Sequence, residues 1–215
     1  MELLDKLIAN PNILYIYEIG LQIFDLFDNV EDRDFLLIVT DDFDRFAFFE
    51  DDEFDDSIRF QIISLKKWFE KVLAGDLLAW ECACLPKKFI HKEHVKLMLK
   101  TDPLELRKNF DLLIKANQQE AFKYYNDGYT LTAQKLLWEI VKYAKFANQI
   151  IENHKIVSFI SVNNDYKKIV DGQTTDWQKI LDTFNDRLLK PKALLKKYTD
   201  DLLRRSKIKK IIQNG

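Results

Sequence analysis

A chain of 215 residues, 47% of them hydrophobic, is long enough to bury a substantial core in one large domain or two small ones. The formal net charge of −2 gives no overall sign of nucleic-acid binding. No signal-peptide pattern and no apolar stretch of membrane-spanning length is found, so we expect no membrane partner. Cys82 and Cys84 are too close for an ordinary disulfide and lack a zinc-ligand set, so we expect reduced thiols and a cytoplasmic location.

The first hundred residues combine short strand patterns with short helical ones. Runs of apolar, aromatic and β-branched residues predict a helix at 2–9, a strand at 12–18, a short helix at 20–27, and strands at 35–40, 45–49 and 58–65. The acidic run at 50–56 is predicted to be a solvated hairpin loop. This mixture is typical of a small sheet with helices packed on it.

The hydrophobic period changes from two to 3.6 after Ser64. The next helix is expected to end at Gly75, and its apolar residues are expected to share one face: Leu65, Trp68, Phe69, Val72 and Leu73. Further helices are predicted at 76–84, 104–125, 130–152 and 163–171, and from 177 onward. We therefore predict an α+β protein, with a small mixed sheet and flanking helices in residues 1–100 and an all-helical half in residues 101–215.

Two acidic residues, Asp32 and Asp34, open the strongest strand pattern of the chain. Because side chains alternate along a strand, the two carboxylates are expected to point to the same face of the sheet. Two adjacent like charges are costly unless a cation lies between them, and that cation is usually a divalent metal. The alternative is that both are solvated charges at the start of a strand.

Several short motifs stand in the order and spacing of one known family. They are Gly20 twelve residues before the acidic pair, Ser64-Leu65-Lys66-Lys67 after the last strand, and the segments Gln134 to Lys142 and Asn164 to Gly172 in the helical half. With these motifs the chain resembles the predicted nucleotidyltransferases of bacteria and phages, which belong to the DNA polymerase β-like superfamily. The resemblance covers roughly residues 12–198 and implies a nucleotidyltransferase-like fold.

The resemblance also implies a chemistry, with the ligand between the two halves. Asp32 and Asp34 would be catalytic and would hold Mg²⁺, which stabilises charge on the transferring phosphorus of an NTP. Gly20, Lys135 and Lys142 would bind the nucleotide, and the acceptor, which is unknown, could be a nucleic-acid end. The two lysines lie seven residues apart on one helix face, which also fits an ordinary exposed face.

Four positions depart from the family pattern. Leu21 replaces a serine, Asp25 replaces a glycine, and Glu139 stands where a histidine is expected. The third acid of the family is missing, since the residues expected to face the acidic pair are Arg59 or Gln61. These changes leave two interpretations: an active transferase, or a decayed transferase fold that acts as a binding, structural or interaction protein.

Two other features have an ordinary and a functional interpretation. The residues from Arg187 to the end are strongly basic, which fits either a solvated helix face or an arm that contacts phosphates. His91 and His94 flank Glu93 closely, but we expect them to be surface histidines near a loop rather than metal ligands.

Overall fold

The computed structural model divides the chain into two compact units, Met1–Leu99 and Lys100–Gly215. The described residues are 3–24, 26, 33–44, 58–97, 99, 102–172 and 174–214, with side chains as far as residue 204. In that part of the chain no helix combines the length and the apolar character needed to cross a membrane.

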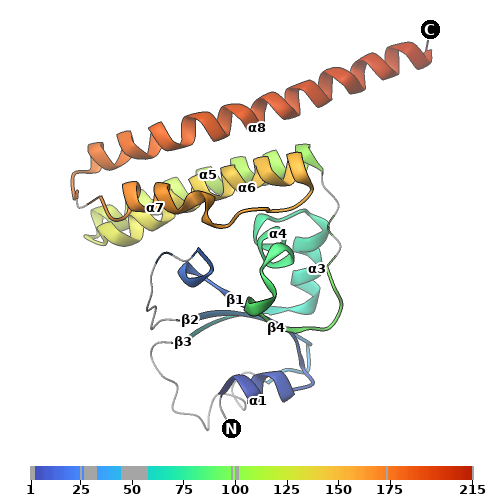
Figure 1. The fold of residues 1–215 in the computed structure, drawn as a ribbon, viewed down its shortest axis with the longest axis vertical. Helices are drawn as coiled ribbons and strands as arrows, with labels where there is room; N and C mark the ends of the chain where they lie inside the picture. Colours follow the sequence, from blue (N-terminus) through green and yellow to red (C-terminus); the bar gives the residue numbers. More distant parts are fainter. Residues whose placement is uncertain are drawn as a thin grey trace. The chain divides into compact units, whose positions relative to one another are not determined.

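The first unit is an α+β structure, which confirms the predicted fold class (Figure 1). Its described elements are α1 (Leu3–Ala9), β1 (Ile13–Ile19), η1 (Leu21–Phe24), β2 (Arg33–Val39), β3 (Ile58–Ser64), α3 (Leu65–Leu73), α4 (Leu77–Cys84), η2 (Lys87–Phe89) and β4 (Ile90–Glu93). The four strands form a mixed sheet in the order β3-β2-β1-β4. Strand β1 is antiparallel to β2 and β4, whereas β2 and β3 are parallel.

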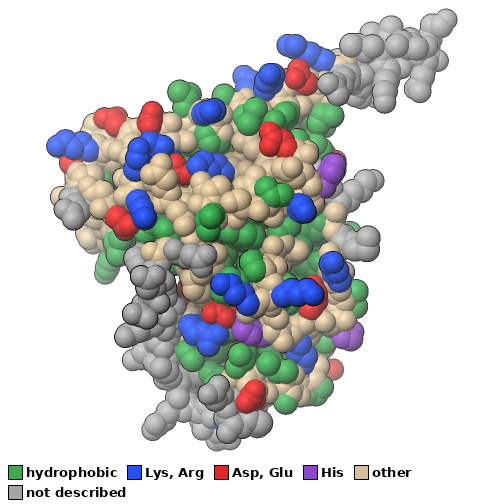
Figure 2. Space-filling model, in the orientation of Figure 1, with side chains coloured by type: hydrophobic (Ala, Val, Ile, Leu, Met, Phe, Trp, Pro, Cys, Tyr) green, Lys and Arg blue, Asp and Glu red, His purple; other side chains and the backbone are tan. Residues whose placement is uncertain are grey.

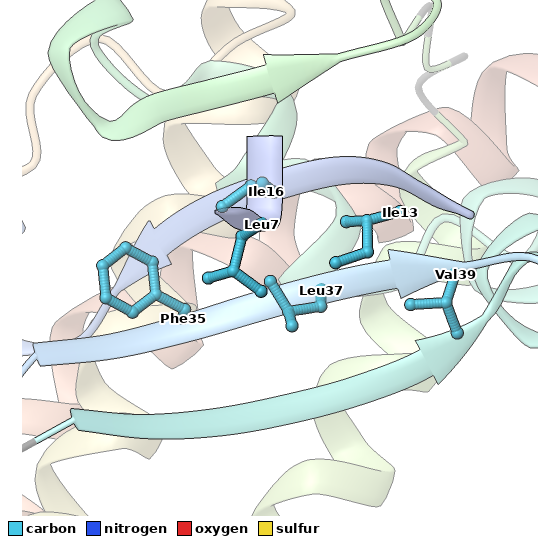
Figure 3. Close-up of a cluster of buried hydrophobic side chains, with 6 residues drawn as sticks. All are labelled: Leu7, Ile13, Ile16, Phe35, Leu37 and Val39. Atoms are coloured by element: carbon cyan, nitrogen blue, oxygen red, sulfur yellow. The ribbon is translucent and has the colours of Figure 1, made fainter. Parts of the chain in front are cut away.

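Strand β2 occupies the middle of the sheet because both of its faces are apolar. Its residues from Phe35 to Val39 are all buried, as expected for a strand covered on both sides. On the face toward α1 the core cluster consists of Leu7, Ile13, Ile16, Phe35, Leu37 and Val39 (Figure 3). Each such side chain stabilises the fold by about 1.5–3 kcal/mol when it leaves water.

The opposite face of the sheet is covered by α3 and α4 (Figure 1). Trp68 of α3 is fully buried, with its ring centroid 5.9 Å from that of Tyr17 of β1. The predicted buried face of α3 is wrong in part, because Phe69 is 46% exposed and Leu73 is 86% exposed. A helix of only nine residues that contacts the sheet through Trp68 leaves its last turn in solvent, before Gly75 ends it with φ +64°.

Strand β4 was not predicted from the sequence. It pairs with β1 through a short, irregular register around Ile16 and Lys92, and it brings His91 into the sheet rather than onto a surface loop. Within the predicted helix at 20–27, the described residues Leu21–Phe24 form the four-residue 3₁₀ turn η1. The predicted strand at 45–49 and the acidic loop at 50–56 lie outside the described residues.

The second unit is all-helical, as predicted. Its described helices are α5 (Pro103–Asn126), α6 (Thr130–Asn153), η3 (Ile160–Val162), α7 (Asn163–Ile169) and α8 (Trp177–Asn214). The Asp102 carboxylate caps α5 by accepting from the Leu104 N–H at 2.9 Å, and Asp176 caps α8 in the same way. Helix α6 is the central element, since it packs against α5, α7 and α8.

One buried carboxylate joins three of these helices. Asp165 of α7 is 1% exposed and forms an ion pair with Lys145 of α6. The guanidinium of Arg187 on α8 lies 3.8 Å from its other oxygen. Lys145 and Arg187 thus compensate the buried charge from two helices. The Lys145 ammonium also donates to the Ser161 carbonyl at 3.1 Å, which helps to hold it in place.

Candidate functional site

Asp34 lies at the end of the sheet where β2 begins, opposite Arg59 of the parallel strand β3. The Arg59 guanidinium holds both carboxylate oxygens: Nε donates to Oδ1 at 2.7 Å and Nη2 donates to Oδ2 at 3.3 Å. The Arg59 side chain is 62% exposed and that of Asp34 is 31% exposed. A pair this exposed contributes about 1 kcal/mol or less to stability, but it occupies the carboxylate in a bidentate geometry.

Gly20 directly follows β1 and lies against the same carboxylate. Its φ of +104° is one that residues with a side chain rarely adopt, and a Cβ added there would lie 2.7 Å from Asp34 Oδ2. The Gln22 side chain folds back over this turn and donates to the Ile19 carbonyl at 2.6 Å. The structure therefore brings together Gly20 and Asp34, two of the residues predicted for the site.

The other acidic residues predicted near this turn, Asp32 and Asp25, lie outside the described residues. Arg59 is one of the two residues, with Gln61, that the sequence analysis placed where the family has its third acid. Within the described ranges, no three or more His, Cys, Asp or Glu side chains gather as a metal site would require. A divalent metal needs free oxygen ligands, so the guanidinium bound to Asp34 does not fit a Mg²⁺ site.

A second polar cluster, which the sequence analysis missed, lies on the other face of the sheet. Glu18 of β1 is 7% exposed and accepts from Arg33 Nε at 3.0 Å and Nη2 at 2.8 Å. His91 Nε2 of β4 lies 2.7 Å from the same carboxylate. The Phe35 ring packs against both partners, 4.9 Å from the Arg33 guanidinium carbon and 5.7 Å from the His91 ring.

Burial alone would raise the pKa of Glu18, but the hydrogen bonds and positive charge of Arg33 and His91 outweigh it. The pKa of Glu18 is therefore lowered from 4.5. A sequence signal for this cluster existed in the charged residue Glu18 within an apolar strand. Its partners, however, come from two other strands, and β4 has no apolar alternation.

We expect Glu18→Gln to lower the free energy of unfolding of the first unit by about 1–2 kcal/mol near neutral pH, because charged hydrogen bonds are lost. Since its pKa is depressed in the folded state, Glu18 stabilises the fold at pH values above 4.5 and stops doing so as the pH falls through the folded-state pKa. Urea unfolding of both proteins across this range should show the difference shrinking in acid. An undiminished difference well below that pKa would contradict the assignment.

The predicted lysines Lys135 and Lys142 lie on α6 in the second unit. Lys135 is half-buried, and Lys142 is only 5% exposed. The Lys142 ammonium lies 4.1 Å from the centroid of the Tyr143 ring and 5.6 Å from that of Trp138. Lys142 therefore stacks on aromatic rings of its own helix, a contact worth about 0.5–2 kcal/mol, rather than standing on an exposed face.

Comparison with known proteins yields one distant structural match. No family model matches the chain, and none of the curated proteins does. Among solved structures, the chain is similar to the crystal structure of a nucleotidyltransferase-like protein from Exiguobacterium sibiricum 255-15. The two share 13% sequence identity with a TM-score of 0.38, and the match covers 94% of this chain and 78% of that chain.

Proposed function

We propose that this protein is a nucleotidyltransferase-type protein that no longer performs metal-dependent transfer and instead acts as a binding or assembly protein. The observation that carries the proposal is the bidentate ion pair between Arg59 and Asp34. In the active alternative, Asp34 and Asp32 would hold Mg²⁺ for transfer from an NTP. Here an internal cation already balances the charge of Asp34.

The surroundings of Asp34 support the same interpretation. Gly20 keeps the close approach to the acidic strand that the resemblance implies for a nucleotide-binding turn. The Gln22 side chain, however, folds over this turn, with Oε1 3.0 Å from the place of a Gly20 Cβ. Leu21 supplies no hydroxyl for a triphosphate. Gly20 and Asp34 of the transferase-type layout are thus retained, whereas a third acid is missing and Leu21 stands where the resemblance expects a serine.

The direct test is incubation of the full chain with labelled NTPs, Mg²⁺ or Mn²⁺, and DNA or RNA acceptors. The control is the double variant Asp32→Ala, Asp34→Ala. We expect label incorporation by the two proteins to be equal and at background. Incorporation by the wild type that the double variant abolishes would overturn the proposal and identify an active nucleotidyltransferase.

A gain-of-function variant tests whether Arg59 prevents the site from binding a metal. Arg59→Glu places a carboxylate opposite Asp34, at one of the two positions where the family pattern would have the third acid. We expect this variant to bind Mn²⁺ about tenfold or more tightly than the wild type, as measured by titration calorimetry. Arg59→Gln, which removes the cation without adding an oxygen anion, is the matched control. Equal Mn²⁺ affinity for Arg59→Glu and Arg59→Gln would contradict the idea that Arg59 replaces a metal ligand.

A further inference from the structure

The C-terminal half of α8 concentrates positive charge in a chain whose net charge is −2. Residues 190–210, called the basic segment below, contain two acidic residues, Asp200 and Asp201. They contain nine basic ones: Lys190, Lys192, Lys196, Lys197, Arg204, Arg205, Lys207, Lys209 and Lys210. The backbone is helical throughout this segment, and the helix rises by about 1.5 Å per residue.

Packing within the second unit fixes which way this helix faces. The buried stripe of α8 comprises Ile180, Phe184, Leu188, Leu195 and Thr199. The first five basic residues of the segment, Lys190 to Arg204, are all exposed (Figure 2 shows blue side chains along this helix). Since each residue turns the helix by about 100°, Lys190, Lys197 and Arg204 fall on one line roughly opposite the stripe, about 10 Å apart.

Asp186 and Asp201 also fall on this line, but neither forms an ion pair with any of the five exposed basic residues in the described part of the unit. Within the portion of the unit that the structure describes, these five side chains take part in no ion pair. The other acid of the basic segment, Asp200, already accepts from Arg107 Nη1 of α5 at 3.1 Å. The same guanidinium donates to Thr199 Oγ1 at 2.9 Å, which anchors α8 at the middle of the basic segment.

We propose that the basic segment binds nucleic acid through its phosphate backbone. A line of exposed cations matches a chain of phosphates, and neutralising them releases condensed counterions. The exposed leucines of the region do not form a continuous apolar face for a membrane surface. Leu189 and Leu203 face a similar direction but stand about 21 Å apart along the helix with Lys192 and Lys196 between them, and Leu202 lies in line with the buried stripe. The binding carries no sequence preference, since phosphate contacts position a protein without reading bases. The inference concerns the second unit and does not depend on whether Asp34 is catalytic.

The test compares the full chain with two charge-matched variants in binding to fluorescein-labelled DNA and RNA duplexes. In the first variant the five exposed basic residues of the segment become Gln: Lys190, Lys192, Lys196, Lys197 and Arg204. In the second, five exposed lysines elsewhere in the unit become Gln: Lys115, Lys123, Lys155, Lys167 and Lys168. Both variants lose five positive charges, so a difference between them reports position rather than net charge. Circular dichroism checks that both remain folded.

At about 0.05 M salt we expect the first variant to lose tenfold or more in affinity and the second to lose about twofold or less. Because each phosphate contact contributes about 0.9 to the logarithmic salt dependence, the slope should fall by about 4 in the first variant only. The proposal is overturned if the wild type binds neither duplex, or if both variants weaken equally. Tighter binding to phosphatidylserine vesicles or to polyglutamate than to the duplexes would overturn it as well.

Discussion

Replacing Asp165 with Ala is expected to lower the free energy of unfolding of the helical unit by about 3 kcal/mol. The carboxylate is 1% exposed and is held by Lys145 and Arg187, so its removal leaves two cations facing an apolar interior. Both cations keep about a quarter of their side chains in contact with solvent, which places the expected loss at the lower end for a broken buried pair. Urea unfolding gives the free energy, and hydrogen exchange in α6, α7 and α8 localises the loss.

Asp186→Ala is the matched control, because Asp186 also contacts Arg187 but is 76% exposed. It should change the free energy of unfolding by about 0.5 kcal/mol or less. In a double-mutant cycle, Lys145→Ala should cost much less in the Asp165→Ala background than in the wild type. Additive losses for the two substitutions would show that the ion pair is not the source of the stability.

Gly20→Ala is expected to destabilise the first unit by about 2–3 kcal/mol, because two costs combine. A φ of +104° is strained for any residue with a Cβ, and the added atom would lie 2.7 Å from Asp34 Oδ2. The carboxylate cannot move away freely, since Arg59 holds both of its oxygens. Thermal and urea unfolding measure the loss, and hydrogen exchange should rise first in β1 and β2.

Gly75→Ala provides the comparison within the same unit. Its φ of +64° lies in the left-handed helical region, and the nearest atom to an added Cβ is Trp80 Nε1 at 3.9 Å. This variant should therefore cost only the backbone term, about 1 kcal/mol. If Gly20→Ala and Gly75→Ala destabilise the unit equally, then the contact between Gly20 and Asp34 contributes nothing.

In the helical half, the local sequence pattern predicted the long helices correctly. Helices at 104–125 and 130–152 were predicted from the 3.6-residue period, and α5 and α6 agree with them to within one residue at each end. Long amphipathic helices separated by a glycine turn carry this signal within their own sequence. Helix α8 was likewise predicted to begin at Trp177, because Asp176 is a strong N-cap residue.

Short elements were harder to predict because their neighbours in space form them. Strand β4 has four residues, of which His91, Lys92 and Glu93 are polar. It forms because its backbone pairs with the edge of β1. Helix α3 was predicted at the correct place, but the exposure of Leu73 depends on how much of the sheet lies beneath the helix. Period and propensity do not carry that information.

The amino-acid sequence by itself determined the α+β class, the buried central strand, the long helices and the concentration of charge in the basic segment, because these follow from residues close together along the chain. The sequence left Arg59 and Gln61 as alternatives facing the acidic pair, and only the tertiary structure decided which charged groups make contact. Arg59 reaches Asp34 across 25 residues through the parallel register of β2 and β3, and His91 reaches Glu18 across 73 residues. Such pairs depend on strand order and register, which arise when the whole sheet folds and are not encoded in any local pattern.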